Sequence, residues 1–198
     1  MNVYMDITLL PGADISHNFL LERVYRQIHL GLVEGQNADG ISAIGLAFPE
    51  YNAGKHQLGS KLRLGAKLRL FSPDRKTLED FSAQKWLDRL TDYVHLTGIR
   101  NVPDNVTNYK RYKRKQSKSS KVRLARRRAK RSGIKFEEAL KQLDSYEEAF
   151  LEAPFINVSS VSSGHKFRLF VVEESCKELI NEGFSCYGLS TKSSLPDF

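Results

Sequence analysis

Five basic residues repeat at helical spacing near the middle of the chain, in a pattern that can bind phosphates. Their positions i, i+3, i+4, i+7 and i+8 share one side of a helix, and they are Arg123, Arg126, Arg127, Lys130 and Arg131. Val122, Ala125 and Ala129 repeat on another side. Guanidinium groups form paired hydrogen bonds with phosphate oxygens. The spacing therefore predicts a cationic helix that contacts two phosphate backbones.

These residues belong to a basic block, residues 105–136, with fourteen Lys and Arg residues and no Asp or Glu. The rest of the chain holds 17 basic and 23 acidic residues, so the net charge of +8 arises entirely from this block. Such a local excess is typical of a surface that binds a polyanion, here most simply nucleic acid. A disordered tail or a localisation signal is the alternative. The mid-chain position, a cap at Ser119 or Ser120 and a stop at Ser132-Gly133 favour an ordered contact.

The composition predicts a globular, intracellular protein. The chain has 198 residues, 40% of them hydrophobic, which suits one large or two small domains. It lacks a run of about 18 apolar residues, and its first residues do not resemble a signal peptide, so no membrane segment is expected. Cys176 and Cys186 are too few for a disulfide framework and lack the neighbours of a zinc cluster. We expect small buried side chains there and no metal.

The first hundred residues alternate between strand and helix patterns. Apolar residues alternate as in half-buried strands over residues 2–10, 42–48 and 62–71. A helix is expected over residues 16–33, from the apolar stripe of Leu20, Val24, Ile28 and Leu32. A second helix is expected around Trp86, followed by a strand over residues 94–97. The order strand, helix, strand, strand, helix, strand predicts a ferredoxin-like, RNA-recognition-type domain over residues 1–100.

The remaining residues, 101–198, predict a second domain. A break over residues 100–107, which include Pro103, marks the boundary. A short helix is expected over residues 136–143, after the basic block, and strands are expected over residues 166–172 and 184–189. The predicted fold class is therefore α+β, with a ferredoxin-like domain followed by an α+β domain that carries the arginine-rich helix.

Short motifs along the whole chain occur in the same order in one known family. The C-terminal motifs are Pro154-Phe155, Ser160-Val161-Ser162 and the runs 164–170 and 184–190. Earlier motifs are Tyr4 with Asp6, the helical His29, Gly45 with Phe48-Pro49, residues 59–64 and Arg114-Lys115-Gln116. Together they resemble the type I-F CRISPR repeat-processing endoribonuclease, a CRISPR RNA-processing nuclease of the Ypest subtype.

The resemblance implies a catalytic site for cutting precursor CRISPR RNA at the base of a repeat stem-loop. His29 would activate the 2′-hydroxyl of the nucleotide just before the cut, or otherwise manage the proton. Ser160 would hold that ribose, and Tyr187 would help to place His29. Ser162 is the alternative to Ser160 in the same serine-rich run. Because RNA carries its own nucleophile, the enzyme needs only to position groups and move protons, without metal or cofactor. The products would be a 5′-hydroxyl and a 2′,3′-cyclic phosphate.

The resemblance also implies an RNA-binding surface. Arg114 and Gln116 would read base edges at the bottom of the stem, and Phe167 would stack on the last base pair. The arginine-rich helix would enter the groove of the stem. A-form RNA has a deep and narrow major groove, so most of these arginines should add affinity rather than sequence choice. Lys130 keeps its charge but lacks the guanidinium fork.

The leading hypothesis is thus a CRISPR repeat endoribonuclease in the bacterial cytoplasm. It would retain its product and join the other subunits of the type I-F surveillance complex, in defence or in RNA-guided transposition. The alternative from another class is a non-catalytic subunit that binds the RNA hairpin of a guide, with His29 idle. A general RNA-binding protein is the third hypothesis, and it predicts little preference for hairpins.

Overall fold

The fold is α+β, as expected from the sequence, and it consists of two compact units. One unit comprises Met1–Lys115 and Ala153–Phe198, and the other comprises Gln116–Glu152. The computed structural model describes residues 1–10, 12, 14–52, 63–116, 120–146, 151–159 and 164–198. None of the helices in these parts of the chain is long and apolar enough to span a membrane. The predicted boundary after residue 100 stays a prediction.

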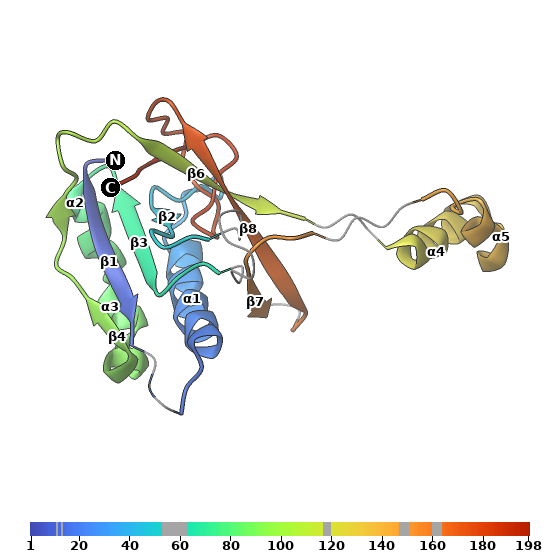
Figure 1. Ribbon diagram of the computed structural model, residues 1–198, viewed down its shortest axis with the longest axis horizontal. Coiled ribbons are helices and arrows are strands. Elements are labelled where there is room, and N and C mark those ends of the chain that lie inside the picture. Colours follow the sequence, from blue (N-terminus) through green and yellow to red (C-terminus); the bar gives the residue numbers. More distant parts are fainter. Residues whose placement is uncertain (11, 13, 53–62, 117–119, 147–150, 160–163) are drawn as a thin grey trace. The chain divides into compact units, whose positions relative to one another are not determined.

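The first sheet of the larger unit has the strand order β2-β3-β1-β4, with β5 beside β1, and every pair is antiparallel (Figure 1). Its strands are β1 (Val3–Leu9), β2 (Gly45–Ala47), β3 (Lys67–Ser72), β4 (Val94–Leu96) and β5 (Arg100–Asn101). Apolar side chains of the central strands, such as Ile7 and Leu68, are fully buried. The alternation in the sequence therefore located the strands that form this core.

Helix α1 (His17–Glu34) contacts β1 of the first sheet and β7 of the second. Ser16 caps its start by accepting a hydrogen bond from the Phe19 amide at 3.4 Å. The predicted stripe, Leu20, Val24, Ile28 and Leu32, is buried. Burying each such side chain contributes roughly 1.5–3 kcal/mol, so this stripe fixes the rotation of the helix and the direction in which its polar residues point.

The second sheet has the antiparallel order β7-β8-β6-β9 (Figure 1). Its strands are β6 (Tyr109–Lys115), β7 (Phe155–Ser159), β8 (Lys166–Cys176) and β9 (Leu195–Pro196). Register pairs Arg114 of β6 with Val171 of β8, and Phe167 of β8 with Val158 of β7. The basic block thus begins with a strand, β6, which places Arg114 next to the β7–β8 hairpin.

The helical region expected around Trp86 is divided into three short pieces. They are α2 (Arg75–Phe81), α3 (Ala83–Trp86) and the 3-10 helix η1 (Asp88–Tyr93). Ser82 has φ 48°, the left-handed conformation, which ends α2 and redirects the chain. The indole of Trp86 then turns back and donates to the Phe81 carbonyl at 3.1 Å.

The predicted strand over residues 184–189 is wrong. Phe184 makes only an isolated bridge with Ser42, and the Gly188 amide donates to the Ser185 carbonyl at 2.8 Å to close a turn. Gly183 and Gly188 have φ values of 82° and 70°, which interrupt extended backbone on both sides. This turn carries Cys186 and Tyr187 toward α1.

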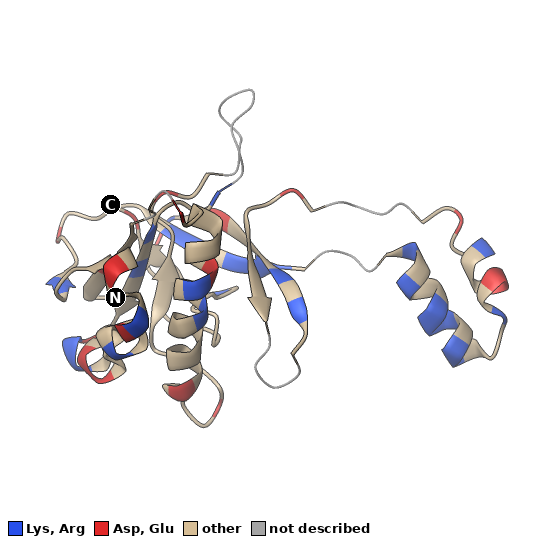
Figure 2. Ribbon diagram, turned by 90° about the horizontal axis from the view of Figure 1, so that it is seen from below, with Lys and Arg blue, Asp and Glu red and all other residues tan. Residues whose placement is uncertain are grey.

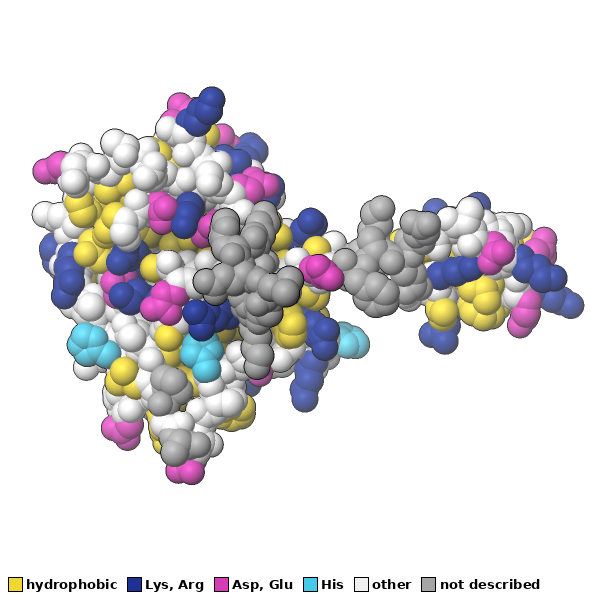
Figure 3. All heavy atoms as spheres, in the orientation of Figure 1, with side chains coloured by type: hydrophobic (Ala, Val, Ile, Leu, Met, Phe, Trp, Pro, Cys, Tyr) yellow, Lys and Arg dark blue, Asp and Glu magenta, His cyan; other side chains and the backbone are white. Residues whose placement is uncertain are grey.

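The smaller unit contains α4 (Lys121–Ser132) and α5 (Phe136–Lys141). The hydroxyl of Ser120 accepts from the Arg123 amide at 3.4 Å, and Gly133 ends α4 in the left-handed conformation. Ala125 of α4 and Ala139 of α5 are fully buried where the two helices contact each other. Figure 2 shows the basic residues of α4 in blue, and the face in Figure 3 has Lys and Arg around a small hydrophobic patch. The capped cationic helix predicted from the sequence is present.

A buried ion pair joins β1 to β3. The Nε of Arg69 donates to the Oδ1 of Asp6 at 2.6 Å, and Nη2 donates to Oδ2 at 3.0 Å. Nη1 also donates to the Phe198 carbonyl at 2.9 Å. The guanidinium carbon lies 4.6 Å from the ring centroid of Tyr4 and 4.3 Å from that of Phe198. Every face of this guanidinium is therefore engaged.

Replacing Asp6 with alanine should lower the free energy of unfolding by about 3–5 kcal/mol, because it leaves the Arg69 charge buried without a counter-ion. Urea denaturation followed by circular dichroism measures the loss. Asp92→Ala is the matched control, since Asp92 is an exposed acid of η1, and its effect should stay within about 0.5 kcal/mol. Equal losses in the two variants would contradict a stabilising role for the pair.

Candidate active site

His29 lies on α1, half-buried, beside the turn that follows Phe184. Its Nδ1 is 2.8 Å from the carbonyl oxygen of Cys186, 157 residues away in the chain. A carbonyl oxygen only accepts, so Nδ1 donates, and in the neutral ring Nε2 keeps its lone pair. The bond fixes both the tautomer and the orientation of the imidazole. Nε2 is thereby available to accept a proton.

Two tyrosine rings lie parallel to the imidazole. The Tyr187 centroid is 4.8 Å away with an interplanar angle of 5°, and the Tyr25 centroid is 6.4 Å away at 7°. The Tyr25 hydroxyl donates to the Tyr187 carbonyl at 3.1 Å. Burial, more than the neighbouring Tyr187, raises the pKa of Tyr25 well above its usual value, so the hydroxyl stays a donor. Tyr25 thus ties the turn to α1 one helical turn before His29.

Arg114 and Phe167 extend this aromatic cluster. The guanidinium carbon of Arg114 lies 5.2 Å from the Phe167 centroid and 5.1 Å from the Tyr187 centroid. Phe167 contacts Tyr187 edge-on at 6.4 Å. Arg114 is exposed, and it forms no ion pair with any acid in the described parts of the chain. Stacking orients the guanidinium fork while its N–H groups remain able to donate.

The sequence-predicted residues are thus only partly brought together. His29, Tyr187, Phe167 and Arg114 form one continuous cluster. Ser160 and its alternative Ser162 lie outside the described residues. Gln116 is exposed and belongs to the smaller unit.

The five predicted phosphate-binding residues are all exposed on α4. They are Arg123, Arg126, Arg127, Lys130 and Arg131. None of them pairs with an acidic side chain in the ranges that the structure describes, whereas Lys121 of the same helix contacts Asp144 at 2.8 Å. Five uncompensated cations along one helix face are suited to binding phosphate groups.

Sequence reasoning did not identify Tyr25 or the Cys186 carbonyl as parts of this site. Tyr25 could have been found from its position four residues before His29, because residues at this spacing are neighbours on a helix. A backbone carbonyl has no sequence signal, because every residue has one. Burial raises the pKa of the Cys186 thiol, so the thiol stays protonated at neutral pH and the residue acts through its backbone.

The geometry supports proton transfer next to a stacked, positively charged platform. A histidine with one nitrogen fixed as a donor can act as a general base through the other. Phe167, which is half-buried, can contact a base by stacking, and the exposed Arg114 can donate hydrogen bonds to bases. Among the described residues, no three His, Cys, Asp or Glu side chains gather in a metal-ligand arrangement.

Fold and site together define an α+β protein with a single histidine held among aromatic rings and a separate cationic helix. A family model described as CRISPR-associated protein (Cas_Csy4) matches residues 4–198. The chain is 33% identical to the CRISPR-associated endonuclease Cas6/Csy4 of Pseudomonas aeruginosa (strain UCBPP-PA14), over 100% of both chains. It is 31% identical to the protein of the same name from Escherichia coli (strain UTI89 / UPEC), also over 100% of both. The chain therefore belongs to the Cas_Csy4 family of CRISPR-associated proteins, which confirms the resemblance in its motifs.

Proposed function

We propose that this protein binds the repeat hairpin of precursor CRISPR RNA and cuts it once, at the 3′ base of the stem. Membership of the Cas_Csy4 family and the name endonuclease of its relatives support the reaction class. The observation that carries the proposal is the bond from His29 to the Cys186 carbonyl, beneath the Tyr187 ring. It leaves one imidazole nitrogen oriented for proton transfer.

The proposed reaction is a metal-independent transesterification. Nε2 of His29 takes the proton of the 2′-hydroxyl on the nucleotide before the cut, and the 2′-oxygen attacks the phosphorus. The bond from phosphorus to the 5′-oxygen breaks, that oxygen takes up a proton from water, and the proton on His29 returns to solvent. The products are a 2′,3′-cyclic phosphate and a 5′-hydroxyl. Tyr187 positions His29, and Ser160, or alternatively Ser162, holds the ribose.

The proposed RNA contacts are of two kinds, those to bases at the bottom of the stem and those to the phosphates of the stem. Phe167 stacks on the last base pair of the stem, and Arg114 and Gln116 donate to base edges there. The cationic face of α4 contacts stem phosphates, which adds affinity without sequence choice. Lys130 contributes charge alone, since its ammonium group cannot form a bidentate contact.

The wider context is also part of the proposal. The product RNA stays bound, and the protein joins the other subunits of a type I-F surveillance complex in the bacterial cytoplasm. The strand order β2-β3-β1-β4 supports a ferredoxin-like arrangement of the first sheet, and the domain division at residue 100 is kept as a hypothesis.

Incubating the protein with a labelled repeat hairpin in EDTA should give one cut with a cyclic phosphate end. A hairpin with a 2′-deoxy nucleotide just before the cut should stay intact while binding with unchanged affinity, because it lacks the nucleophile. Gel electrophoresis of the products and a binding titration measure both outcomes.

Two results would contradict the proposal in different ways. Tight binding of the all-ribose hairpin without cleavage would favour the non-catalytic hairpin-binding subunit. Equal affinity for the hairpin and for an unstructured RNA of the same composition would favour a general RNA-binding protein.

A further inference from the structure

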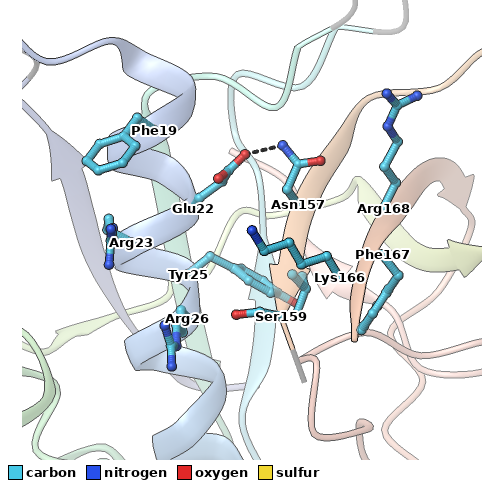
Figure 4. Close-up of a pocket in the computed structure, with 11 residues that line it drawn as sticks. Phe19, Glu22, Arg23, Tyr25, Arg26, Asn157, Ser159, Lys166, Phe167 and Arg168 are labelled. Carbon is cyan, nitrogen blue, oxygen red and sulfur yellow. Dashed lines mark hydrogen bonds between the residues drawn. The ribbon is translucent and has the colours of Figure 1, made fainter. Parts of the chain in front are cut away.

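A groove of about 710 Å³ lies between α1 and the β7–β8 hairpin. Figure 4 shows Phe19, Arg23 and Arg26 following one another along the edge of α1, with Lys166 extending from the hairpin toward the helix. Arg168 and Tyr25 also line the groove. The proposed reaction uses none of the four cationic residues of the groove, which are Arg23, Arg26, Lys166 and Arg168.

The groove is strongly basic. Its lining has four cations, Arg23, Arg26, Lys166 and Arg168, and one acid, Glu22, so its formal net charge is +3. The amide of Asn157 donates to the Glu22 carboxylate across the groove (Figure 4). None of the four cations forms an ion pair with an acidic residue that the structure describes. A concave surface with this charge attracts a polyanion.

Exposed aromatic rings lie against two of these cations. Phe19 is 48% exposed, and the guanidinium carbon of Arg23 lies 4.8 Å from its ring centroid. On the hairpin, the guanidinium carbon of Arg168 lies 4.7 Å from the ring centroid of Phe155, which is 40% exposed but is not among the residues that line the groove. Cations that follow a backbone and rings that stack on bases are the two components of a single-strand-binding surface.

The groove adjoins the candidate active site. Tyr25 and Phe167 line the groove and also belong to the aromatic cluster around His29. Phe19 precedes His29 by ten residues, and at 1.5 Å of rise per residue the tract along α1 extends about 15 Å from the histidine. Arg114 does not line this groove but a different hollow beside Tyr187. Phe167 thus lies between the groove and the hollow that Arg114 lines.

We propose that this groove binds the single-stranded RNA that continues on the 3′ side of the cut. The inference rests on the proposed function, in which the stem base contacts Phe167 and Arg114. The strand beyond the cut phosphate must then leave the His29 site, and the basic groove lies next to that site, because Tyr25 and Phe167 belong to both. Because cleavage detaches this strand, the groove contributes to the affinity for precursor but not to that for the retained product.

The test compares three hairpins that carry a 2′-deoxy nucleotide before the cut position. The first ends at that position, the second continues with a short unpaired 3′ extension, and the third carries the same extension at its 5′ end. The unmodified protein should bind the second about tenfold more tightly than the first at low salt, and the gain should shrink as salt rises. Fluorescence anisotropy measures each affinity.

Two groove variants are compared with one matched control. Arg23→Glu/Arg26→Glu and the milder Arg23→Gln/Arg26→Gln should lose most of the gain from the 3′ extension, while their affinity for the first hairpin changes by less than about twofold. Lys76→Glu/Arg100→Glu makes the same charge change as the reversal, at exposed residues of α2 and β5 outside the groove lining. This control should keep the full gain.

Three outcomes would overturn the inference. The first is equal affinity of the unmodified protein for the first two hairpins. The second is a gain in affinity from the 3′ extension that persists in both groove variants. The third is a loss of affinity in the groove variants that concerns only the hairpin with the 5′ extension. In each of them the hairpin itself still binds, so the proposed function stands. Failure of the unmodified protein to bind any of the three hairpins would overturn the proposed function as well.

Discussion

Replacing His29 with alanine should lower the rate of hairpin cleavage at least about 10²-fold, the usual contribution of a general acid or base. The affinity for the hairpin should change by less than about threefold, because the loss concerns an interaction with the reacting proton rather than with the bound RNA. Single-turnover cleavage with enzyme in excess measures the first effect, and titration of the 2′-deoxy hairpin measures the second.

The interpretation depends on separating chemistry from structure. His29→Gln retains a side chain that can donate to the Cys186 carbonyl, which His29 contacts at 2.8 Å, so it should fold normally and remain inactive. His95→Ala is the matched control, since His95 is exposed on β4, and it should cut at the normal rate. If affinity fell together with the cleavage rate in both His29 variants, His29 would be a structural residue that holds the turn around Tyr187.

Reversing the charges of Arg126 and Arg127 together should weaken hairpin binding by at least about tenfold at moderate salt. Both side chains are exposed and lie on the cationic face of α4. Each lost phosphate contact should also reduce the slope of log affinity against log salt by about 0.7 to 0.9. Anisotropy titrations over a range of salt concentrations give both quantities.

The matched control is Arg128→Glu/Lys135→Glu, which changes the net charge by the same amount. Arg128 lies on the same helix but away from the cationic face, and Lys135 precedes α5. If Arg126 and Arg127 contact the RNA directly, the control should lose much less hairpin affinity than the variant with both of these residues reversed. Identical losses of affinity in the two double variants would mean that only the overall charge of the smaller unit matters. The proposal that the cationic face of α4 contacts the stem phosphates would then be wrong.

The parts of the fold that were predicted well depend on local interactions. The caps at Ser120 and Gly133 and the five cations of α4 follow from residues close together in the sequence. The buried stripe of α1 and the alternation of β1 are equally local patterns. The alternation of apolar residues predicted a strand over residues 184–189 that the structure does not have. Two glycines with positive φ, Gly183 and Gly188, turn the backbone there.

The sequence by itself determined the two chemical capacities of this protein, a cationic helix and a family pattern that includes His29. Tertiary structure alone decided how the histidine ring is oriented. Its tautomer depends on a carbonyl 157 residues away, and the Tyr25 bond to the turn spans 162 residues. The groove likewise combines cations from α1 and from the β7–β8 hairpin. Local propensities fix which residues form a helix or strand, but packing of α1 against two sheets determines which distant groups meet.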